Sequence, residues 1–372
     1  MPRLTLVCTG MGIVQRGFET YMADLAEKLT LGNDDFQVEL YTGGPYISKK
    51  IKTKQLFCIS RNNRIFNWLF GLNFTSEIEL VTFFLSLSFK LLFQNTNAIY
   101  LGEYKLYCYL FKFRKLFKKQ FSLVLYTGGQ VKPGLYDIQK DYVHHITDIY
   151  YGNLLNEGYP AERQFIIPHF ITDQVTYVAE NSIDIRKKAK QKKVVISIGL
   201  IDKQIKRMDL LVEILAKNSA DYFPVILGEF TKDTPEIINS LKLNFGLDGY
   251  YLAKVEREAV FNYLNQSDIF ILLSPKESFG LASLEALSVG LPVITCDYFE
   301  SRYVLKDYAT RINNLDSNNV LKELESSLIT NNSKLDIESR KKFVNDHYSW
   351  ANLQIQYRDM FFEVLGLKQK TF

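Results

Sequence analysis

Short apolar runs alternate along the chain with longer stretches whose apolar residues recur at helical spacing. The runs are four to six residues long and rich in branched and aromatic side chains, which is typical of strands buried on both faces. In chain order they are Leu4–Cys8, Phe36–Tyr41, Ala98–Gly102, Leu123–Tyr126, Val143–Thr147, Val194–Gly199, Pro224–Gly228, Tyr250–Ala253, Asp268–Leu273 and Val293–Cys296. This alternation predicts an α/β protein built on doubly wound parallel sheets.

The stretch from Ser274 to Cys296 has the clearest local pattern, because it reads as loop, helix, stop and strand. A helix is predicted from about Gly280 to Val289. Gly290 then falls where a helix C-cap is expected, and Pro292 prevents the helix from continuing. With a strand on either side, this stretch is a βαβ unit, and such sheets bind ligands beyond the carboxyl ends of their strands.

Two carboxylates stand out in this apolar stretch. Glu277 lies in the loop before the helix, and Glu285 lies inside the helix among leucine, alanine and serine residues. A carboxylate there needs a partner, because burying it alone costs several kcal/mol. The backbone N–H groups of Phe279, Gly280 and Leu281 at the helix start suit a phosphate. These N–H groups can donate hydrogen bonds to a phosphate, and the two carboxylates beside them can accept hydrogen bonds from hydroxyl groups. Together they match the chemistry of a nucleoside diphosphate sugar.

The composition indicates a globular protein of two domains. The chain has 372 residues, of which 47% are hydrophobic and 23% charged. Its four cysteines are scattered, with no histidine beside any of them, so we expect reduced core thiols and no metal site. The N-terminus leads directly into a predicted strand, so we expect no signal peptide.

The positive charge is concentrated in the N-terminal half. Residues 1–170 hold 19 Lys and Arg against 14 Asp and Glu, a net of +5, whereas the remainder holds 26 against 27, a net of −1. Two basic runs, Lys49–Arg64 and Lys105–Lys119, account for much of the excess and are interspersed with apolar residues. The apolar stretch between Glu79 and Phe93 is too short and too polar to span a bilayer, and a buried helix is predicted there.

The Glu277 to Glu285 stretch resembles the Glu-x7-Glu motif of retaining glycosyltransferases with the GT-B fold, in particular the GT4 family (glycosyl transferases group 1). The likeness includes the Glu-x-Phe-Gly-Leu opening and the Gly-x-Pro-Val ending, and it extends over nearly the whole chain. It implies two Rossmann-like doubly wound domains that face a central cleft. It also implies that Glu277 contacts the hydroxyls of the donor sugar and that Glu285 binds the ribose.

Other segments extend this resemblance to the diphosphate. Lys206 corresponds to the family's diphosphate-binding lysine, in a loop that follows Gly199. The family's arginine position is occupied by Leu200, and the nearby Lys203 or Arg207 supplies a substitute cation in this hypothesis. Phosphate clamps need such cations aimed at the leaving group.

The N-terminal half agrees with the family in part. Arg-Gly-Phe-Glu-Thr before the first helix looks like the family's glycine loop, which makes Gly12 and Gly17 candidate donor-site residues. Gly128 stands where many members have a histidine that reaches the transferred sugar. Of the neighbours His144 and His145, we expect one to point into the core and one outward, because they lie on one strand.

Residues 1–173, together with a returning C-terminal helix at about 350–372, are predicted to form the acceptor domain. Residues 174–349 are predicted to form the nucleotide-sugar domain, and the charged run 174–193 is predicted to be a linker. No aromatic stacking platform accompanies that run, which argues against nucleic-acid binding.

The leading hypothesis is a retaining, metal-independent, cofactor-free transferase that moves a hexose from a nucleotide diphosphate sugar to a hydroxyl of a glycan or glycolipid. We expect a cytoplasmic enzyme, peripheral at an anionic membrane surface or fully in solution. A sugar-nucleotide epimerase, a phosphorylase and a non-catalytic membrane-associated partner subunit stay open as alternatives.

Overall fold

The computed structural model of the chain describes residues 1–14, 16–31, 34–48, 50–128, 140–172, 183–330 and 333–367. It divides the chain into two compact units, each considered by itself below. Unit 1 comprises Met1–His169 and Leu353–Phe372, and unit 2 comprises Phe170–Asn352. The chain passes from one unit to the other at 169/170 and 352/353, and the sequence predicts boundaries at 173/174 and 349/350.

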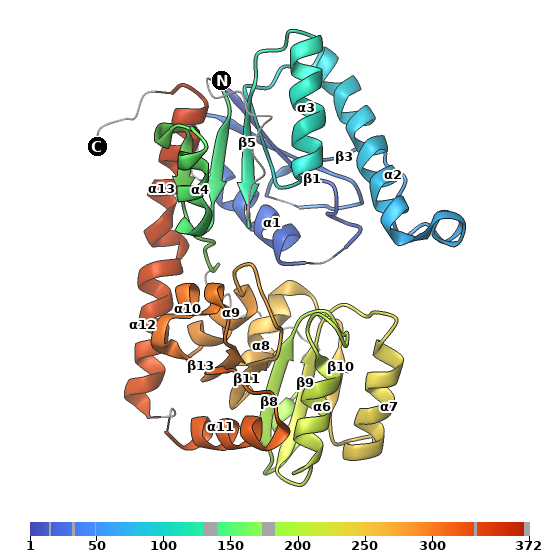
Figure 1. Cartoon of the computed structure of the whole chain (residues 1–372), viewed down its shortest axis with the longest axis vertical. Helices are drawn as coiled ribbons and strands as arrows, with labels where there is room; N and C mark the ends of the chain where they lie inside the picture. Colours follow the sequence, from blue (N-terminus) through green and yellow to red (C-terminus); the bar gives the residue numbers. More distant parts are fainter. Residues whose placement is uncertain are drawn as a thin grey trace. The chain divides into compact units, whose positions relative to one another are not determined.

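Unit 1 contains a parallel sheet in the order β3-β2-β1-β4-β5-β6-β7. Its strands are β1 (Arg3–Cys8), β2 (Gln37–Thr42), β3 (Lys52–Gln55), β4 (Ala98–Leu101), β5 (Ser122–Thr127), β6 (Tyr142–His145) and β7 (Gln164–Ile166). Its helices are α1 (Gly17–Thr30), α2 (Arg64–Phe93), α3 (Tyr104–Leu116), α4 (Tyr151–Asn156) and most of α13 (Trp350–Val364). Figure 1 labels the helices of this unit together with β1, β3 and β5.

The two faces of this sheet are covered by different helices. On one face, strand residues such as Leu101 and Leu123 share a buried cluster with Phe83 of α2 and Leu110 of α3. On the other face, Tyr100 of β4 contacts residues of α1 and α13. The central strands β1, β4 and β5 are covered on both sides and are nearly continuous apolar runs, as the sequence pattern predicts, whereas the edge strand β3 is polar and partly exposed.

Unit 2 contains a second parallel sheet in the order β10-β9-β8-β11-β12-β13. Its strands are β8 (Lys193–Ile198), β9 (Tyr222–Leu227), β10 (Tyr251–Ala253), β11 (Ile269–Leu272), β12 (Val293–Cys296) and β13 (Ala309–Ile312). Its helices are α5 (Ile185–Ala189), α6 (Met208–Ala216), α7 (Thr234–Phe245), α8 (Val260–Leu264), α9 (Leu281–Ser288), α10 (Phe299–Leu305), α11 (Ser317–Thr330) and α12 (Lys334–Tyr348).

Each sheet has one point at which the strand order reverses direction. In unit 1 this point lies between β1 and β4, and in unit 2 it lies between β8 and β11. The connections that leave two such strands run to opposite sides of the sheet, and this opens a crevice at the carboxyl edge. The sheet topology therefore predicts that ligand-binding residues directly follow β1, β4, β8 and β11.

Two sequence-based predictions are wrong in detail. His144 and His145 are both buried, because His144 contacts Tyr357 of α13 on one face of the sheet and His145 contacts Tyr151 of α4 on the other. The predicted linker is also too long. Within its described part, Ile185 and Ala189 of α5 are buried in unit 2, and Arg186 pairs with Asp268, so residues 183–193 belong to that unit.

Candidate active site

Helix α9 of unit 2 begins as the sequence predicts. Gly280 is its N-cap residue, with φ 80° and ψ 45°, a left-handed conformation that favours glycine. The first N–H groups of a helix have no partner within that helix, and here they lie at the carboxyl edge of the sheet after β11. The start of α9 is therefore arranged as an anion-binding position.

The two glutamates of the motif are both paired with cations. Glu277, in the loop after β11, accepts a hydrogen bond from the Lys206 ammonium. Glu285 has only 4% of its surface exposed, and it forms an ion pair with Arg257. The prediction that a carboxylate at position 285 must have a partner is therefore confirmed. The sequence reasoning missed the partner itself, because Arg257 lies outside the motif, in the loop after β10.

The loop that presents Lys206 is held by a single carboxylate. One oxygen of Asp202 accepts hydrogen bonds from the backbone N–H groups of Gln204, Ile205 and Lys206, at 3.1, 2.7 and 2.9 Å. Gly199 at the end of β8 leaves room for the lysine stem, because a Cβ there would lie 2.9 Å from Cε of Lys206. This arrangement places Lys206 at the point where the strand order reverses.

The other predicted donor-site residues lie around this pair. Lys203 is paired with Glu236 of α7 at 2.7 Å, so it does not reach Glu277 in this structure. Arg207 is the left-handed N-cap residue of α6, with φ 52°. The Phe279 ring is buried and lies edge-on against Tyr348, with 5.8 Å between the centroids, so only its backbone is available to a ligand.

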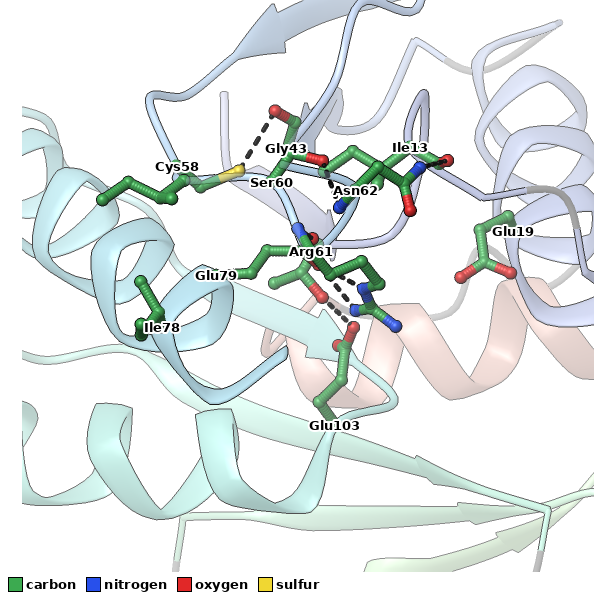
Figure 2. Close-up of polar contacts among 12 residues, drawn as sticks. Ile13, Glu19, Gly43, Cys58, Ser60, Arg61, Asn62, Ile78, Glu79 and Glu103 are labelled. Atoms are coloured by element: carbon green, nitrogen blue, oxygen red, sulfur yellow. Dashed lines mark hydrogen bonds and ion pairs between the residues drawn. The ribbon is translucent and has the colours of Figure 1, made fainter. Parts of the chain in front are cut away.

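Unit 1 has a different polar cluster at its carboxyl edge, shown in Figure 2. Thr9, directly after β1, donates a hydrogen bond to Oε1 of Glu103, two residues after β4. Oε2 of Glu103 is buried and has no hydrogen-bond partner among the described residues. Burial raises the pKa of the Glu103 carboxyl, and the neighbouring Glu19 raises it further. Glu19 itself is paired with Arg16.

The loop after β3 is fixed to the same edge. Arg61 binds the fully buried Glu79 of α2 through its Nε, its Nη2 and its backbone N–H. The Asn62 amide donates to the carbonyl of Ile13 at 3.0 Å, and the Cys58 thiol donates to the carbonyl of Gly43. These contacts give unit 1 a formed surface after β1, β3 and β4.

The glycines predicted for this region have separate roles. Gly12 has φ +78°, and a Cβ there would lie 2.5 Å from the carbonyl carbon of Gly44, so no larger residue fits. Gly17 is the first residue of α1. Gly128 follows β5 directly, so no side chain extends from this position.

Behind that edge lies a buried network of tyrosines and histidines that the sequence reasoning did not identify. The Tyr100 hydroxyl lies 2.7 Å from Nδ1 of His144, and the Tyr126 hydroxyl lies 2.6 Å from Nε2 of His169. Tyr21 of α1 stacks on His169 with 4.2 Å between centroids. Burial lowers the pKa of His144 to about 3 and that of His169 well below its usual value. These imidazoles are neutral structural groups at physiological pH.

Two absences concern only the residues that the structure describes. Within them, no three His, Cys, Asp or Glu side chains gather in a way that could hold a metal ion. No helix among these residues is long and apolar enough to cross a membrane.

Comparison with known proteins relates unit 2 to one family. Residues 178–349 match the family described as glycosyl transferases group 1. N-acetyl-alpha-D-glucosaminyl L-malate synthase of Bacillus anthracis is 31% identical over 153 residues. That alignment spans 38% of this chain and 39% of the length of that protein.

Solved structures resemble the chain along almost its whole length. Sucrose-phosphate synthase from Thermosynechococcus elongatus matches with a TM-score of 0.74 at 15% identity, over 98% of this chain and 100% of that one. HepE of Anabaena, solved in complex with UDP and glucose, matches with a TM-score of 0.70 at 12% identity, over 98% and 100%. At these identities the likeness shows a shared fold alone.

Proposed function

We propose that this chain, whose residues 178–349 belong to the glycosyl transferases group 1 family, is a retaining hexosyltransferase that uses a nucleotide diphosphate sugar. The GT-B fold of its structural neighbours supports the proposal. So does the structure of the Anabaena protein, which was solved in complex with UDP and glucose. The hexose, the retaining outcome and the acceptor are inferences from these likenesses and from the site.

The observation that carries the proposal is the pair of ion pairs at the carboxyl edge of unit 2. Glu277 with Lys206 and Glu285 with Arg257 flank the N-terminus of α9. A nucleoside diphosphate has anionic phosphates beside two ribose hydroxyls, and a sugar adds further hydroxyls. The phosphates of such a ligand can bind the cations and the helix N–H groups, and its hydroxyls can donate hydrogen bonds to the carboxylates.

The chemistry follows from how these charges change when a donor binds. The diphosphate attracts the Lys206 ammonium and frees Glu277 to accept hydrogen bonds from the sugar. As the glycosidic bond breaks, negative charge grows on the leaving phosphate, and Lys206 with the α9 N–H groups stabilises it. The acceptor hydroxyl then attacks on the same face as the leaving group and passes its proton to the phosphate oxygen. No side chain is assigned as a nucleophile.

The acceptor is assigned to unit 1, whose carboxyl edge carries the Glu103 carboxyl at the point where the strand order reverses. A carboxyl oxygen without a donor suits a hydroxyl, the group that a glycan or glycolipid acceptor supplies.

Transfer assays with a panel of UDP-, GDP- and ADP-hexoses test the proposal. We expect turnover or slow donor hydrolysis with one nucleotide class, and a product that keeps the anomeric configuration of the donor by NMR. Activity should persist in EDTA, because the positive charge at the diphosphate comes from side chains. An inverted product or a strict need for a divalent ion would contradict the retaining, metal-independent assignment.

The alternatives give different products in the same assays. An epimerase would convert the sugar nucleotide without an acceptor, and a phosphorylase would need inorganic phosphate. A non-catalytic subunit would bind no nucleotide sugar. This alternative is motivated by Leu200 and Gly128, which stand where the family has an arginine and a histidine. The preserved Lys206–Glu277 pair favours an active enzyme.

A further inference from the structure

The C-terminal part of helix α2, residues 80–93, carries apolar side chains on two of its sides. Its inner side packs into the core through Leu80, Phe83, Leu87 and Leu91. Its outer side exposes Leu85, Phe89 and Phe93, with 60, 67 and 79% of their surfaces accessible. An apolar helix face normally packs against an apolar environment, whereas the outer face of this part of α2 is exposed to solvent.

The exposed residues form a stripe rather than isolated positions. Val81, Leu85, Phe89 and Phe93 follow one another at spacings of four residues, which aligns them on one helical face. Single exposed apolar residues are ordinary, whereas contiguous apolar patches mark interaction sites. The outer face of α2 is therefore a candidate contact surface.

Helix α3 continues this surface and adds positive charge. The two helices lie side by side on one face of the sheet, and Phe84 of α2 contacts Tyr109 of α3 with ring centroids 5.2 Å apart (Figure 1). At the ends of the helices, Lys119 donates to the carbonyl of Leu92 at 2.9 Å. Leu116 is 75% exposed there and Phe117 also faces solvent. We call the exposed residues of this region the α2–α3 surface, namely Val81, Leu85, Phe89, Leu92, Phe93, Leu116 and Phe117 with Lys112, Lys115, Lys118 and Lys119.

The lysines of the α2–α3 surface have no ion pair with any described carboxylate. They differ in this from the described lysines of the first basic run, Lys49–Arg64. In that run Lys50 pairs with Glu27, and both Lys52 and Lys54 pair with Glu39. In the second run Lys105 pairs with Glu77, and Arg114 is buried on Asp141. What remains is Lys112, Lys115, Lys118 and Lys119, beside exposed phenylalanines and leucines and without an acidic residue from position 104 to 119.

We propose that the α2–α3 surface docks unit 1 on an anionic lipid bilayer. Exposed aromatic and leucine side chains enter the boundary between headgroups and acyl chains, and the four lysines bind the anionic headgroups around them. Charge complementarity favours this occupant over a second copy of the chain, since two copies of one cationic surface repel each other. The surface stands independently of the donor site, and its link to a lipid-linked acceptor rests on the proposed function.

Flotation with vesicles tests the docking proposal on the full-length protein. We expect binding to vesicles of equal parts phosphatidylglycerol and phosphatidylcholine at low salt, little binding to phosphatidylcholine alone, and release by added salt. Replacing the four lysines by glutamine should weaken binding on the order of 10³-fold, since each lysine near such a surface contributes roughly a factor of five. The triple variant Leu85→Ser, Phe89→Ser, Phe93→Ser should reduce it to a similar degree.

Matched variants of unit 2 control for general loss of charge and apolar surface. Lys187→Gln, Lys188→Gln, Lys190→Gln and Lys193→Gln remove the same charge from exposed positions. Leu243→Ser, Ile329→Ser and Leu335→Ser remove comparably exposed apolar side chains. Both controls should bind vesicles as the wild type does. Circular dichroism checks that every variant is folded.

Three results would overturn the docking proposal. The first is no binding to either vesicle at low salt, and the second is equal loss in the unit 2 controls. The third is a dimer in light scattering that the Leu85, Phe89 and Phe93 variant converts to a monomer, which would assign the face to a second copy. Nucleotide binding measured in parallel separates this proposal from the donor site, because vesicle binding without nucleotide binding would contradict only the proposed function.

Discussion

At the carboxyl edge of unit 2, two glutamates are each paired with a cation, whereas at the same edge of unit 1 the Glu103 carboxyl accepts a hydrogen bond from the Thr9 hydroxyl and forms no ion pair with any described residue. Both edges lie where the strand order reverses, so the topology is shared and the electrostatics differ. Ion pairs suit a ligand with negatively charged phosphates, because the phosphates can replace the glutamates as partners of the cations. A carboxyl with a buried, unpartnered oxygen suits a neutral ligand that supplies a hydrogen-bond donor.

Breaking the Lys206–Glu277 pair should have the largest effect. Lys206→Ala removes a preorganised charge beside the leaving phosphate, and we expect a loss in kcat on the order of 10²-fold. Glu277→Ala should lower kcat by a similar factor with a smaller change in KM, because in the proposed mechanism its contact with the sugar strengthens as the bond breaks. Steady-state kinetics with the active donor measure both. Kinetics like those of the wild type in both variants would remove the basis of the donor-site assignment.

Arg257 provides a second test of the ion pairs in unit 2, and it was identified from the structure and not from the motif. Arg257→Gln leaves Glu285 without its cation, and we expect nucleotide affinity to fall about 10-fold while kcat changes less. Arg186→Gln is a matched control, since Arg186 forms an ion pair with Asp268 just before β11, at the opposite edge of the sheet. Equal losses in the two variants, measured by calorimetry, would mean that Arg257 has no particular role at the site.

In unit 1, the buried histidines predict a dependence of stability on pH. Burial lowers the pKa of His144 to about 3 and of His145 to about 4, against roughly 6.5 in the unfolded chain. Below pH 6.5 the unfolded chain therefore binds protons that the folded unit does not, and stability falls with decreasing pH. Each histidine should contribute a slope of up to about 1.4 kcal/mol per pH unit between pH 6 and pH 4.

Denaturant unfolding of the wild type and of His145→Gln measures this slope, because glutamine keeps a hydrogen-bonding side chain at that position and cannot gain the proton. The variant should show a shallower decline in the free energy of unfolding. An identical decline in both proteins would mean that His145 is not the group that loses stability.

Glu103 should show the smallest effect and the most specific one. Its folded pKa is raised, so its contribution to stability is present at low pH and is lost as pH rises through that pKa. Glu103→Gln removes the cost of a buried charge, and we expect a gain of about 1 kcal/mol in the free energy of unfolding at pH 8. Transfer to the acceptor should fall while nucleotide affinity stays unchanged. A loss of stability would instead assign Glu103 a structural role through Thr9.

The difference between the units also explains what the sequence could predict. Unit 2 was predicted to within a residue or two at α9 and β12, because glycine, proline and periodic apolar residues act locally there. The GT-B fold is confirmed by the structural neighbours, and the need for a partner at Glu285 followed from burial alone. Arg257 was missed because its contact joins the segment after β10 to Glu285 inside α9, 28 positions further along the chain.

Unit 1 was harder to predict, because its polar residues are recruited over long sequence distances. The Thr9–Glu103 contact spans 94 positions, and no local spacing indicates it. The outward-facing prediction for one of the histidines was wrong because period-two alternation assumes one solvated face, and both faces of this sheet are covered. The sequence also predicts a buried helix between Glu79 and Phe93, whereas the outer face of α2 is exposed. An apolar run alone does not reveal which side of a helix meets solvent.

Binding of nucleoside diphosphates tests the central claim most directly. Thermal unfolding with UDP, GDP, ADP or CDP should show stabilisation by one of them, by about 2.7 kcal/mol at a concentration 100 times the Kd. Glu285→Gln should reduce that shift while leaving the melting temperature without nucleotide nearly unchanged. No shift with any of the four nucleotides, or an equal shift in Glu285→Gln, would contradict the assignment of the carboxyl edge of unit 2 as the donor site.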